Sequence, residues 1–284
     1  MVILPALERL ARRVLHRRGF RSRYAETPIG RIHAYEAEGE GSLPTMVVIH
    51  GLGSAATAFL PVLVRLRRHA RRIVAFDVPG HGFSDPPRAR LTPAVLDTAL
   101  ATAFESIVPE RAILIGNSLG GALALSRAVS HPEKVEALVL LSPAGSPASD
   151  EEWERIRVLF RMETRKEARA FLERIYHRPP AFLTWLLSYE MPASVRRAAV
   201  RDLIETASNA DCPTPEALAA LPMPILFSWG RSERLFSDAQ LAWFQANLPK
   251  HALIELPEGY GHCPHFDGPS KLADRILAFA RAPR

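Results

Sequence analysis

The stretch that decides the fold is Ala112-Ile113-Leu114-Ile115-Gly116-Asn117-Ser118-Leu119-Gly120-Gly121. Its first four residues are apolar without alternation, which is typical of a strand buried on both faces of a parallel sheet. The Gly-x-Ser-x-Gly that follows predicts a sharp turn, and Gly121–Ser130 is compatible with a helix. Small residues two positions before and after the serine allow such a turn to lift its hydroxyl clear of the sheet. Ser118 is therefore the predicted nucleophile, and the alternative is an ordinary glycine-rich turn.

An earlier loop supplies the groups that a nucleophilic serine needs for charge stabilisation. His50-Gly51-Leu52-Gly53 follows the apolar run 46–49. Two backbone N–H groups must point at one spot to bind an oxyanion, one from the residue after the nucleophile and one from such a loop. The sequence predicts that these are the N–H groups of Leu119 and Leu52. His50 is a base by residue type, but its place at a strand end favours a structural role.

A serine hydroxyl is a weak nucleophile at neutral pH and requires a neighbouring base. Of the ten histidines, His262 is the best candidate, because it lies in a Gly-Tyr-Gly-His loop between the apolar segment 252–256 and an apolar C-terminal helix from about residue 269. His265, three residues later, is the alternative. His81 lies in a glycine-rich loop that we expect it to shape.

The base requires an orienting acid, which we expect at the end of the apolar run 225–229. Glu233 is the first acid after that run, and Asp238 follows five residues later, where a helix is expected to begin. Asp150 and Glu151 offer another placement, beyond the run 137–141. Glu233 is the predicted acid, which gives the chain order serine, acid, histidine.

Apolar runs alternate with helical segments along most of the chain, which predicts an α/β fold with a mostly parallel central sheet covered on both faces. Between residues 145 and 221 the alternation stops, and Ser149-x-x-Glu152 and Thr164-x-x-Glu167 resemble capping boxes that open helices. We therefore expect an α/β core made of residues 24–144 and 222–284 and an inserted all-helical cap at 145–221.

The positive charge of the chain is concentrated at its beginning. Residues 1–23 contain seven arginines and one acid, which equals the whole net charge of +6. The remaining residues are balanced, so a nucleic-acid-binding surface on the body is not expected. The apolar residues of the segment recur at helical spacing, which predicts a basic amphipathic arm that either packs on the body or contacts an anionic membrane surface. We expect a cytoplasmic protein, with peripheral membrane contact as an option.

The motifs and their order resemble those of the α/β-hydrolases that carry a helical cap. The matching segments are HGLG at 50–53, DVPGHGFS at 77–84, GNSLGG at 116–121, WGRSE at 229–233 and GH at 261–262. The LLSPAG stretch at 140–145, together with the N-terminal arm, is more similar to monoacylglycerol lipases and related esterases. The elbow is also similar to that of carbon–carbon bond hydrolases, although the loops at 50–54 and after His262 differ from theirs. Glu233 departs from the aspartate most common in the family.

This resemblance implies a serine hydrolase that cleaves a small-molecule carboxylic ester with an apolar acyl group through Ser118, Glu233 and His262. The alternatives are a carbon–carbon bond hydrolase of a ring-cleavage diketone, a thioesterase or a lactonase with the same residues, and a non-enzymatic scaffold. We expect no cofactor and no metal, since His262, Cys263 and His265 lack a usual zinc spacing. The cap offers six large side chains as walls of an acyl pocket or as its own core: Trp153, Phe160, Phe171, Phe182, Trp185 and Met191.

Overall fold

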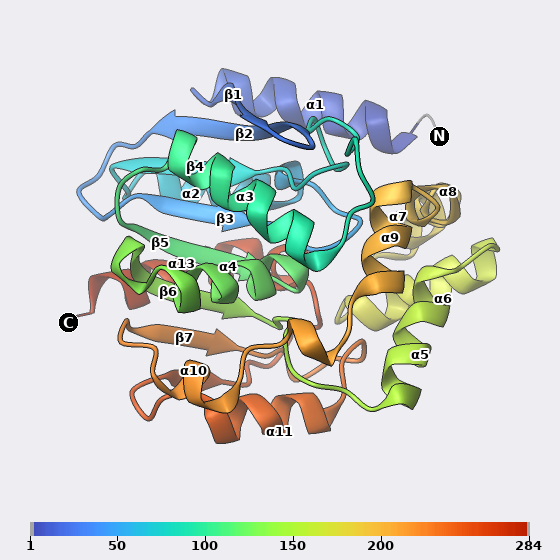
Figure 1. The fold of residues 1–284 in the computed structure, drawn as a ribbon. Coiled ribbons are helices and arrows are strands. Elements are labelled where there is room, and N and C mark those ends of the chain that lie inside the picture. Colours follow the sequence, from blue (N-terminus) through green and yellow to red (C-terminus); the bar gives the residue numbers. More distant parts are fainter. Residues whose placement is uncertain (1–2, 283–284) are drawn as a thin grey trace.

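An eight-stranded sheet runs through the computed structural model, which describes residues 3–282. The spatial order of the strands is β1-β2-β4-β3-β5-β6-β7-β8 (Figure 1). The strands are β1 (Arg21–Thr27), β2 (Gly30–Glu38), β3 (Met46–Ile49), β4 (Arg72–Phe76), β5 (Ala112–Asn117), β6 (Val135–Leu141), β7 (Ile225–Ser228) and β8 (Leu253–Glu255). The hairpin of β1 and β2 is antiparallel and β2 also pairs antiparallel with β4, whereas every pairing from β4 to β8 is parallel.

Each central strand is buried on both faces, because alternate residues contribute to two separate hydrophobic cores. In β3, Val47 and Ile49 belong to one core, and Met46 and Val48 belong to the other. The same division holds in β6. This arrangement explains why the strands appear in the sequence as continuous apolar runs.

Helices cover the two faces of the sheet. One core is closed by α3 (Pro93–Ile107), α4 (Leu119–Ser130) and α11 (Asp238–Asn247), and the other by α2 (Leu60–Arg67) and α13 (Pro269–Arg281). A short 3₁₀ turn, η1 (Ala56–Phe59), precedes α2, and α12 (Pro264–Asp267) precedes α13. The short α10 (Pro215–Ala219) leads into β7 and contributes Leu218 to the first core.

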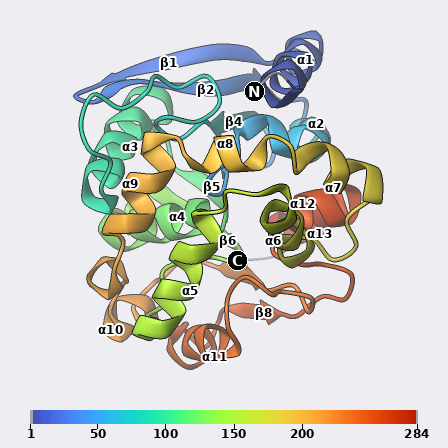
Figure 2. The same cartoon turned by 90° about the vertical axis from the view of Figure 1, so that its right-hand side faces the viewer.

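The segment between β6 and β7 forms a helical cap over the carboxyl ends of the strands (Figures 1 and 2). Its helices are α5 (Asp150–Phe160), α6 (Arg165–Ile175), α7 (Ala181–Leu187), α8 (Met191–Val195) and α9 (Ala198–Thr206). Both predicted capping boxes are present, at Ser149 with Glu152 and at Thr164 with Glu167. The predicted fold class, a mostly parallel α/β sheet with an inserted helical cap, is therefore confirmed.

The chain begins with α1 (Ile3–Arg17), which crosses the edge of the molecule beside β1 and β2 (Figure 1). The predicted amphipathic helix is confirmed, and β1 starts at Arg21, within the segment 1–23. The helix packs on the body through Leu15, which is fully buried, and the following Phe20 is buried as well. None of the helices within residues 3–282 is long and apolar enough to cross a membrane.

Candidate active site

Ser118 occupies a strained turn between β5 and α4. Its φ of 54° and ψ of −120° lie in a region that L-residues rarely adopt, at a cost of about 1–3 kcal/mol. The turn is tight enough that a Cβ on Gly116 would lie 2.1 Å from the carbonyl oxygen of Gly120. A side chain at Gly116 would therefore clash with the backbone, which explains why the predicted small residues flank the serine.

His262 and Glu233 form a buried, hydrogen-bonded pair. His262 Nδ1 lies 2.8 Å from Glu233 Oε2, and the two side chains are 4% and 2% exposed. The other carboxylate oxygen of Glu233 accepts hydrogen bonds from the N–H groups of Leu235 at 2.7 Å and Phe236 at 3.2 Å. Because an ionised carboxylate only accepts, this arrangement places the proton of the imidazole on Nδ1 and leaves Nε2 free of that proton.

The two loops that carry this pair are in direct backbone contact. A Cβ on Gly230, which follows β7, would lie 2.4 Å from the carbonyl oxygens of Tyr260 and Gly261. The N–H of Ser232 donates to the carbonyl of Tyr260 at 2.9 Å. Only a glycine permits this approach, and it brings Glu233 within reach of His262, 29 positions later in the sequence.

Glu233 remains ionised although it is buried. Burial alone would raise its pKa, but the charge of His262 and the hydrogen bond from its ring more than offset this effect, and the pKa of Glu233 is lowered. A group with these properties can hold an imidazole in one tautomer and stabilise its protonated form.

Two buried histidines shape the loop that contains Leu52. His50 Nε2 accepts from the N–H of Val78 at 3.0 Å, and its Nδ1 lies 2.8 Å from the carbonyl of Gly51. His81 Nε2 accepts from the N–H of Gly53 at 3.0 Å. Both rings are thus occupied by the backbone, in agreement with the structural roles expected for them.

The N–H groups of Leu52 and Leu119 donate no hydrogen bond to another residue in the described range 3–282. Leu119 is the first residue of α4, so its N–H has no partner within the helix. Both leucines line the same cavity as Ser118. Two free donors therefore lie beside the serine.

The other candidate acids and base are placed differently. Asp238 is an exposed first residue of α11, and Asp150 and Glu151 lie in the exposed first turn of α5. His265 is buried and stacks on Phe59 at 3.9 Å between ring centroids, with neither ring nitrogen hydrogen-bonded to a described residue. Of the acids considered, Glu233 is the one that contacts His262.

Two positioning residues were not anticipated from the sequence. The side-chain amide of Asn117 donates to the carbonyl oxygens of Leu141 and His262, both at 2.8 Å. The Asp267 carboxylate accepts from the N–H of Gly261 at 2.8 Å and from that of His177 at 2.9 Å, which ties the loop before His262 to the end of α6. The only feature of the sequence that could have indicated a positioning role for Asn117 was its place next to Ser118.

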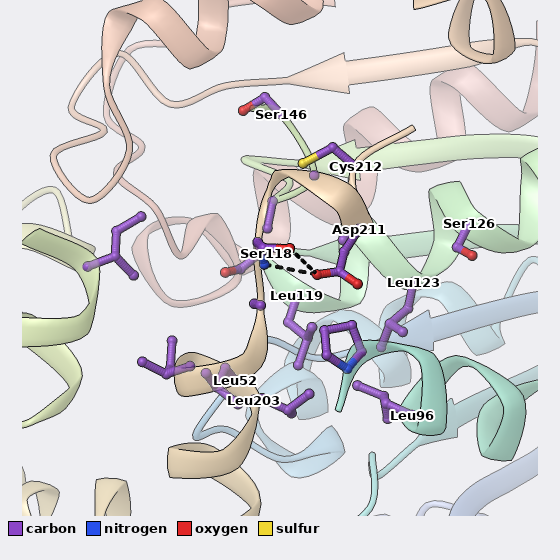
Figure 3. Close-up of a pocket in the computed structure, with 18 of the residues that line it drawn as sticks. Leu52, Leu96, Ser118, Leu119, Leu123, Ser126, Ser146, Leu203, Asp211 and Cys212 are labelled. Carbon is purple, nitrogen blue, oxygen red and sulfur yellow. Dashed lines mark hydrogen bonds between the residues drawn. The ribbon is translucent and has the colours of Figure 1, made fainter. Parts of the chain in front are cut away.

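A first cavity of about 320 Å³ extends from Ser118 beneath α5 and α9. Its lining is mainly apolar and includes Leu96 from α3, Leu123 from α4 and Leu203 from α9 (Figure 3). Asp211 also lines it (Figure 3), but its carboxylate accepts hydrogen bonds from the N–H and hydroxyl of Ser208. The cavity is therefore suited to an apolar chain.

A second cavity of about 550 Å³ also reaches Ser118 and contains His262. Its walls come from α1, from the cap helices α6 to α8 and from the loop after Leu52. The lining residues from α1 are Leu4, Pro5, Leu7, Glu8, Arg9 and Ala11. Ser118 and His262 thus line one cavity, without a hydrogen bond between their side chains among the described residues. Such bonds are often long before substrate binds.

The large cap side chains fall into different groups. Phe160 lines both cavities, Trp153 lines the first, and Phe171 and Met191 line the second. Phe182 and Trp185 line neither cavity and are exposed on α7. The expectation that these two residues form pocket walls or cap core is therefore wrong.

The cysteines are poorly suited to act as thiolates. Burial raises the pKa of Cys212 to about 11, and burial also raises that of Cys263 well above its ordinary value. Within residues 3–282, no group of three or more His, Cys, Asp and Glu side chains is arranged to hold a metal ion.

Comparison with known proteins agrees with this fold. A model described as the alpha/beta hydrolase family matches residues 46–275, and the chain belongs to that family. A pimeloyl-[acyl-carrier protein] methyl ester esterase from Yersinia enterocolitica is 27% identical over 258 residues, which cover 86% of this chain and 95% of the esterase.

Two solved structures share the fold. A bacterial membrane phospholipase A, described as a virulence factor, has a TM-score of 0.81 and 26% identity, covering 99% of this chain and 94% of its own. The 2-hydroxy-6-oxo-6-phenylhexa-2,4-dienoate hydrolase from Rhodococcus sp. has a TM-score of 0.78 and 20% identity, covering 93% and 99%. The predicted superfamily is confirmed, and the protein is a hydrolase with esterase-type relatives.

Proposed function

We propose that this protein is a serine hydrolase of carboxylic esters that uses Ser118 as nucleophile, His262 as general base and Glu233 as orienting acid. The observation that carries the proposal is the buried His262–Glu233 pair in the cavity that also contains the strained Ser118. The names of the relative, a methyl ester esterase, and of the similar phospholipase A support an ester substrate.

In the first half of the reaction, Ser118 Oγ attacks the acyl carbonyl carbon while His262 Nε2 accepts the hydroxyl proton. The N–H groups of Leu52 and Leu119 donate to the oxygen that becomes negative. Glu233 keeps the imidazole oriented and stabilises its positive charge, as in other serine–histidine–acid sites. The protonated His262 then donates its proton to the alkoxy oxygen, and the carbon–oxygen bond breaks. Water next attacks the acyl-enzyme with His262 again as base, which releases the acid and restores Ser118.

The lining of the two cavities supports a placement for each half of the ester. His262 must deliver a proton to the departing alcohol, and it lines the second cavity but not the first. The alcohol therefore occupies the larger cavity beside α1. The acyl group occupies the first cavity, whose leucine-rich lining favours an apolar chain.

The direct test combines active-site labelling with a panel of p-nitrophenyl esters of increasing acyl length. A fluorophosphonate should modify Ser118, and Ser118→Ala should fold normally but lose about 10³–10⁶ in kcat. Modification of another serine, or activity that survives in Ser118→Ala, would overturn the assignment. Turnover of a vinylogous ring-cleavage diketone without turnover of any ester would instead identify a carbon–carbon bond hydrolase.

A further inference from the structure

The rest of the protein covers only part of the apolar face of α1. At about 100° per residue, Leu4 and Leu15 lie on one side of the helix, and Leu7 and Leu10 lie progressively further round it. Leu15 is fully buried, whereas Leu7 and Leu10 are 42% and 55% exposed. Packing on the body therefore accounts for only part of the amphipathic pattern, and two leucines remain in contact with solvent.

A second exposed apolar surface lies on and just after α7. Phe182 is 71% exposed and Trp185 is 44% exposed, and Tyr189 is also exposed. The rings form a continuous group, with centroids 6.1 Å apart for Phe182 and Trp185 and 5.1 Å apart for Trp185 and Tyr189. Three neighbouring exposed aromatic side chains are unusual on a water-facing surface and indicate an interaction site.

These two surfaces adjoin each other at the beginning of α1. The carboxylate of Glu190, the residue after Tyr189, accepts hydrogen bonds from the N–H of Ile3 at 2.5 Å and from that of Leu4 at 2.7 Å. Figure 1 shows the start of α1 next to α7 and α8. We define the docking face by Leu7, Leu10, Phe182, Trp185 and Tyr189.

Three arginines lie beside the docking face. Arg9 and Arg13 are exposed on α1, and the guanidinium of Arg165 lies 3.3 Å from the centre of the Tyr189 ring. The one acid of α1, Glu8, lines the second cavity and is partly buried. Aromatic and leucine side chains beside arginines match the interface of an anionic bilayer, where apolar groups enter the headgroup region and guanidinium groups contact phosphates.

We propose that the docking face binds the surface of a membrane that contains anionic lipids. The second cavity reaches this face, because its lining includes the exposed Leu7 on α1 together with Leu183 on α7 and the exposed Phe266. Docking therefore places the cavity that accepts the alcohol half of the ester against the bilayer. This last step rests on the proposed function, whereas binding to the membrane does not.

The test is sedimentation of the full chain with vesicles of phosphatidylcholine alone or mixed with phosphatidylglycerol. We expect binding to the mixed vesicles at low salt and weaker binding at high salt, since salt screens exposed charges. Arg13→Gln and Arg165→Gln should each weaken binding by about fivefold. Phe182→Ala with Trp185→Ala should weaken it by tenfold or more, since both side chains lose apolar contact with the bilayer.

The matched control is Leu253→Gln, because Leu253 is 48% exposed on the edge strand β8, close to the 55% of Leu10. Leu10→Gln should weaken vesicle binding, and Leu253→Gln should leave it unchanged. All these variants should hydrolyse a short soluble ester as the unaltered chain does, which shows that they are folded. Equal loss in the two leucine variants, or no binding to anionic vesicles at low salt, overturns the proposal and leaves a protein partner as the occupant of the face.

Ser118→Ala separates this proposal from the catalytic one. It should bind vesicles like the unaltered chain while losing ester hydrolysis. If Ser118→Ala keeps its activity but the vesicle results hold, the catalytic assignment fails and the docking face stands. If vesicle binding is absent and Ser118→Ala is inactive, the docking proposal fails and the catalytic assignment stands.

Discussion

The side-chain amide of Asn117 donates a hydrogen bond of 2.8 Å to the backbone carbonyl of His262. Asn117 is the last residue of β5 and immediately precedes Ser118, so the turn that carries the nucleophile is joined directly to the loop that carries the base. A second bond from the same amide, to Leu141, fixes the end of β6. The ends of β5 and β6 and the His262 loop are thereby held together around the serine.

Asn117→Leu should therefore impair catalysis without removing a reacting group. The substitution leaves the carbonyl of His262 without its donor, at a cost of about 1–3 kcal/mol, and releases the His262 loop, whereas the carbonyl of Leu141 still accepts from the N–H of Ser118. We expect kcat to fall by about 10–100-fold with a smaller change in KM, and fluorophosphonate labelling of Ser118 to slow in parallel. Steady-state kinetics together with labelling rates provide the measurement. Unchanged labelling would show that Asn117 has no positioning role.

Glu233→Gln should lower kcat by about 10²–10⁴, because the imidazole is no longer held in the productive tautomer. Asp238→Asn is the matched control, since Asp238 is exposed at the start of α11 and should tolerate the change. Kinetics of the two variants with one p-nitrophenyl ester decide the matter. A greater loss in Asp238→Asn would mean that the acid lies five residues later.

Filling the first cavity should change the preference for the acyl group of the ester, and filling the second cavity should change the preference for the alcohol. Ala207 lines the first cavity and Ala58 lines the second. Ala207→Phe should therefore shorten the preferred acyl chain, and Ala58→Phe should disfavour large alcohols at constant acyl length. Each methylene that loses its contact costs about 0.8 kcal/mol, or roughly fourfold in kcat/KM. Profiles of kcat/KM against acyl and alcohol length test the assignment. If Ala207→Phe changed the alcohol preference and Ala58→Phe the acyl preference, the two cavities would have the opposite roles.

Acid should destabilise the protein through two buried histidines. Burial lowers the pKa of His81 and that of His265 from the ordinary value of 6.5 to about 3. Between these values the unfolded chain binds protons that the folded chain does not, so stability is lost as pH falls below about 6.5. Each histidine contributes a slope of about 1.4 kcal/mol per pH unit.

Replacement of one of these histidines should reduce that slope. In His265→Leu, the dependence of the unfolding free energy on pH between 6 and 4 should be shallower by about one proton. Urea denaturation at several pH values measures it. His131→Asn, at an exposed histidine, is measured in parallel as a substitution outside the buried core. An unaltered slope in His265→Leu would show that His265 titrates alike in the folded and unfolded chains.

The strands and cap helices were predictable because their signals are local. The apolar runs at β3 and β5 reflect burial on both faces, and the capping boxes of α5 and α6 reflect backbone groups that need partners within three residues. The pairing of Glu233 with His262 followed from the ordering of parallel strands, whose carboxyl ends meet at one edge.

The remaining features depend on contacts between distant segments. No periodicity relates Glu190 to the first N–H groups of α1, or Asn117 to the carbonyl of His262. The solvent-facing position of Phe182 and Trp185 was also unpredictable, because aromatic residues at helical spacing are usually buried. The packing of α1, the cap and the core loops on one another determines these positions.

Under the proposed function, the wall that α1 contributes to the second cavity gives this helix a role in selectivity for the alcohol. A chain that starts at Tyr24 would retain Ser118, Glu233 and His262 but would lose every α1 residue that lines this cavity. Such a shortened protein would accept bulkier alcohols and discriminate less between them. Under the proposed function, removal of α1 would therefore change the range of esters that the protein hydrolyses.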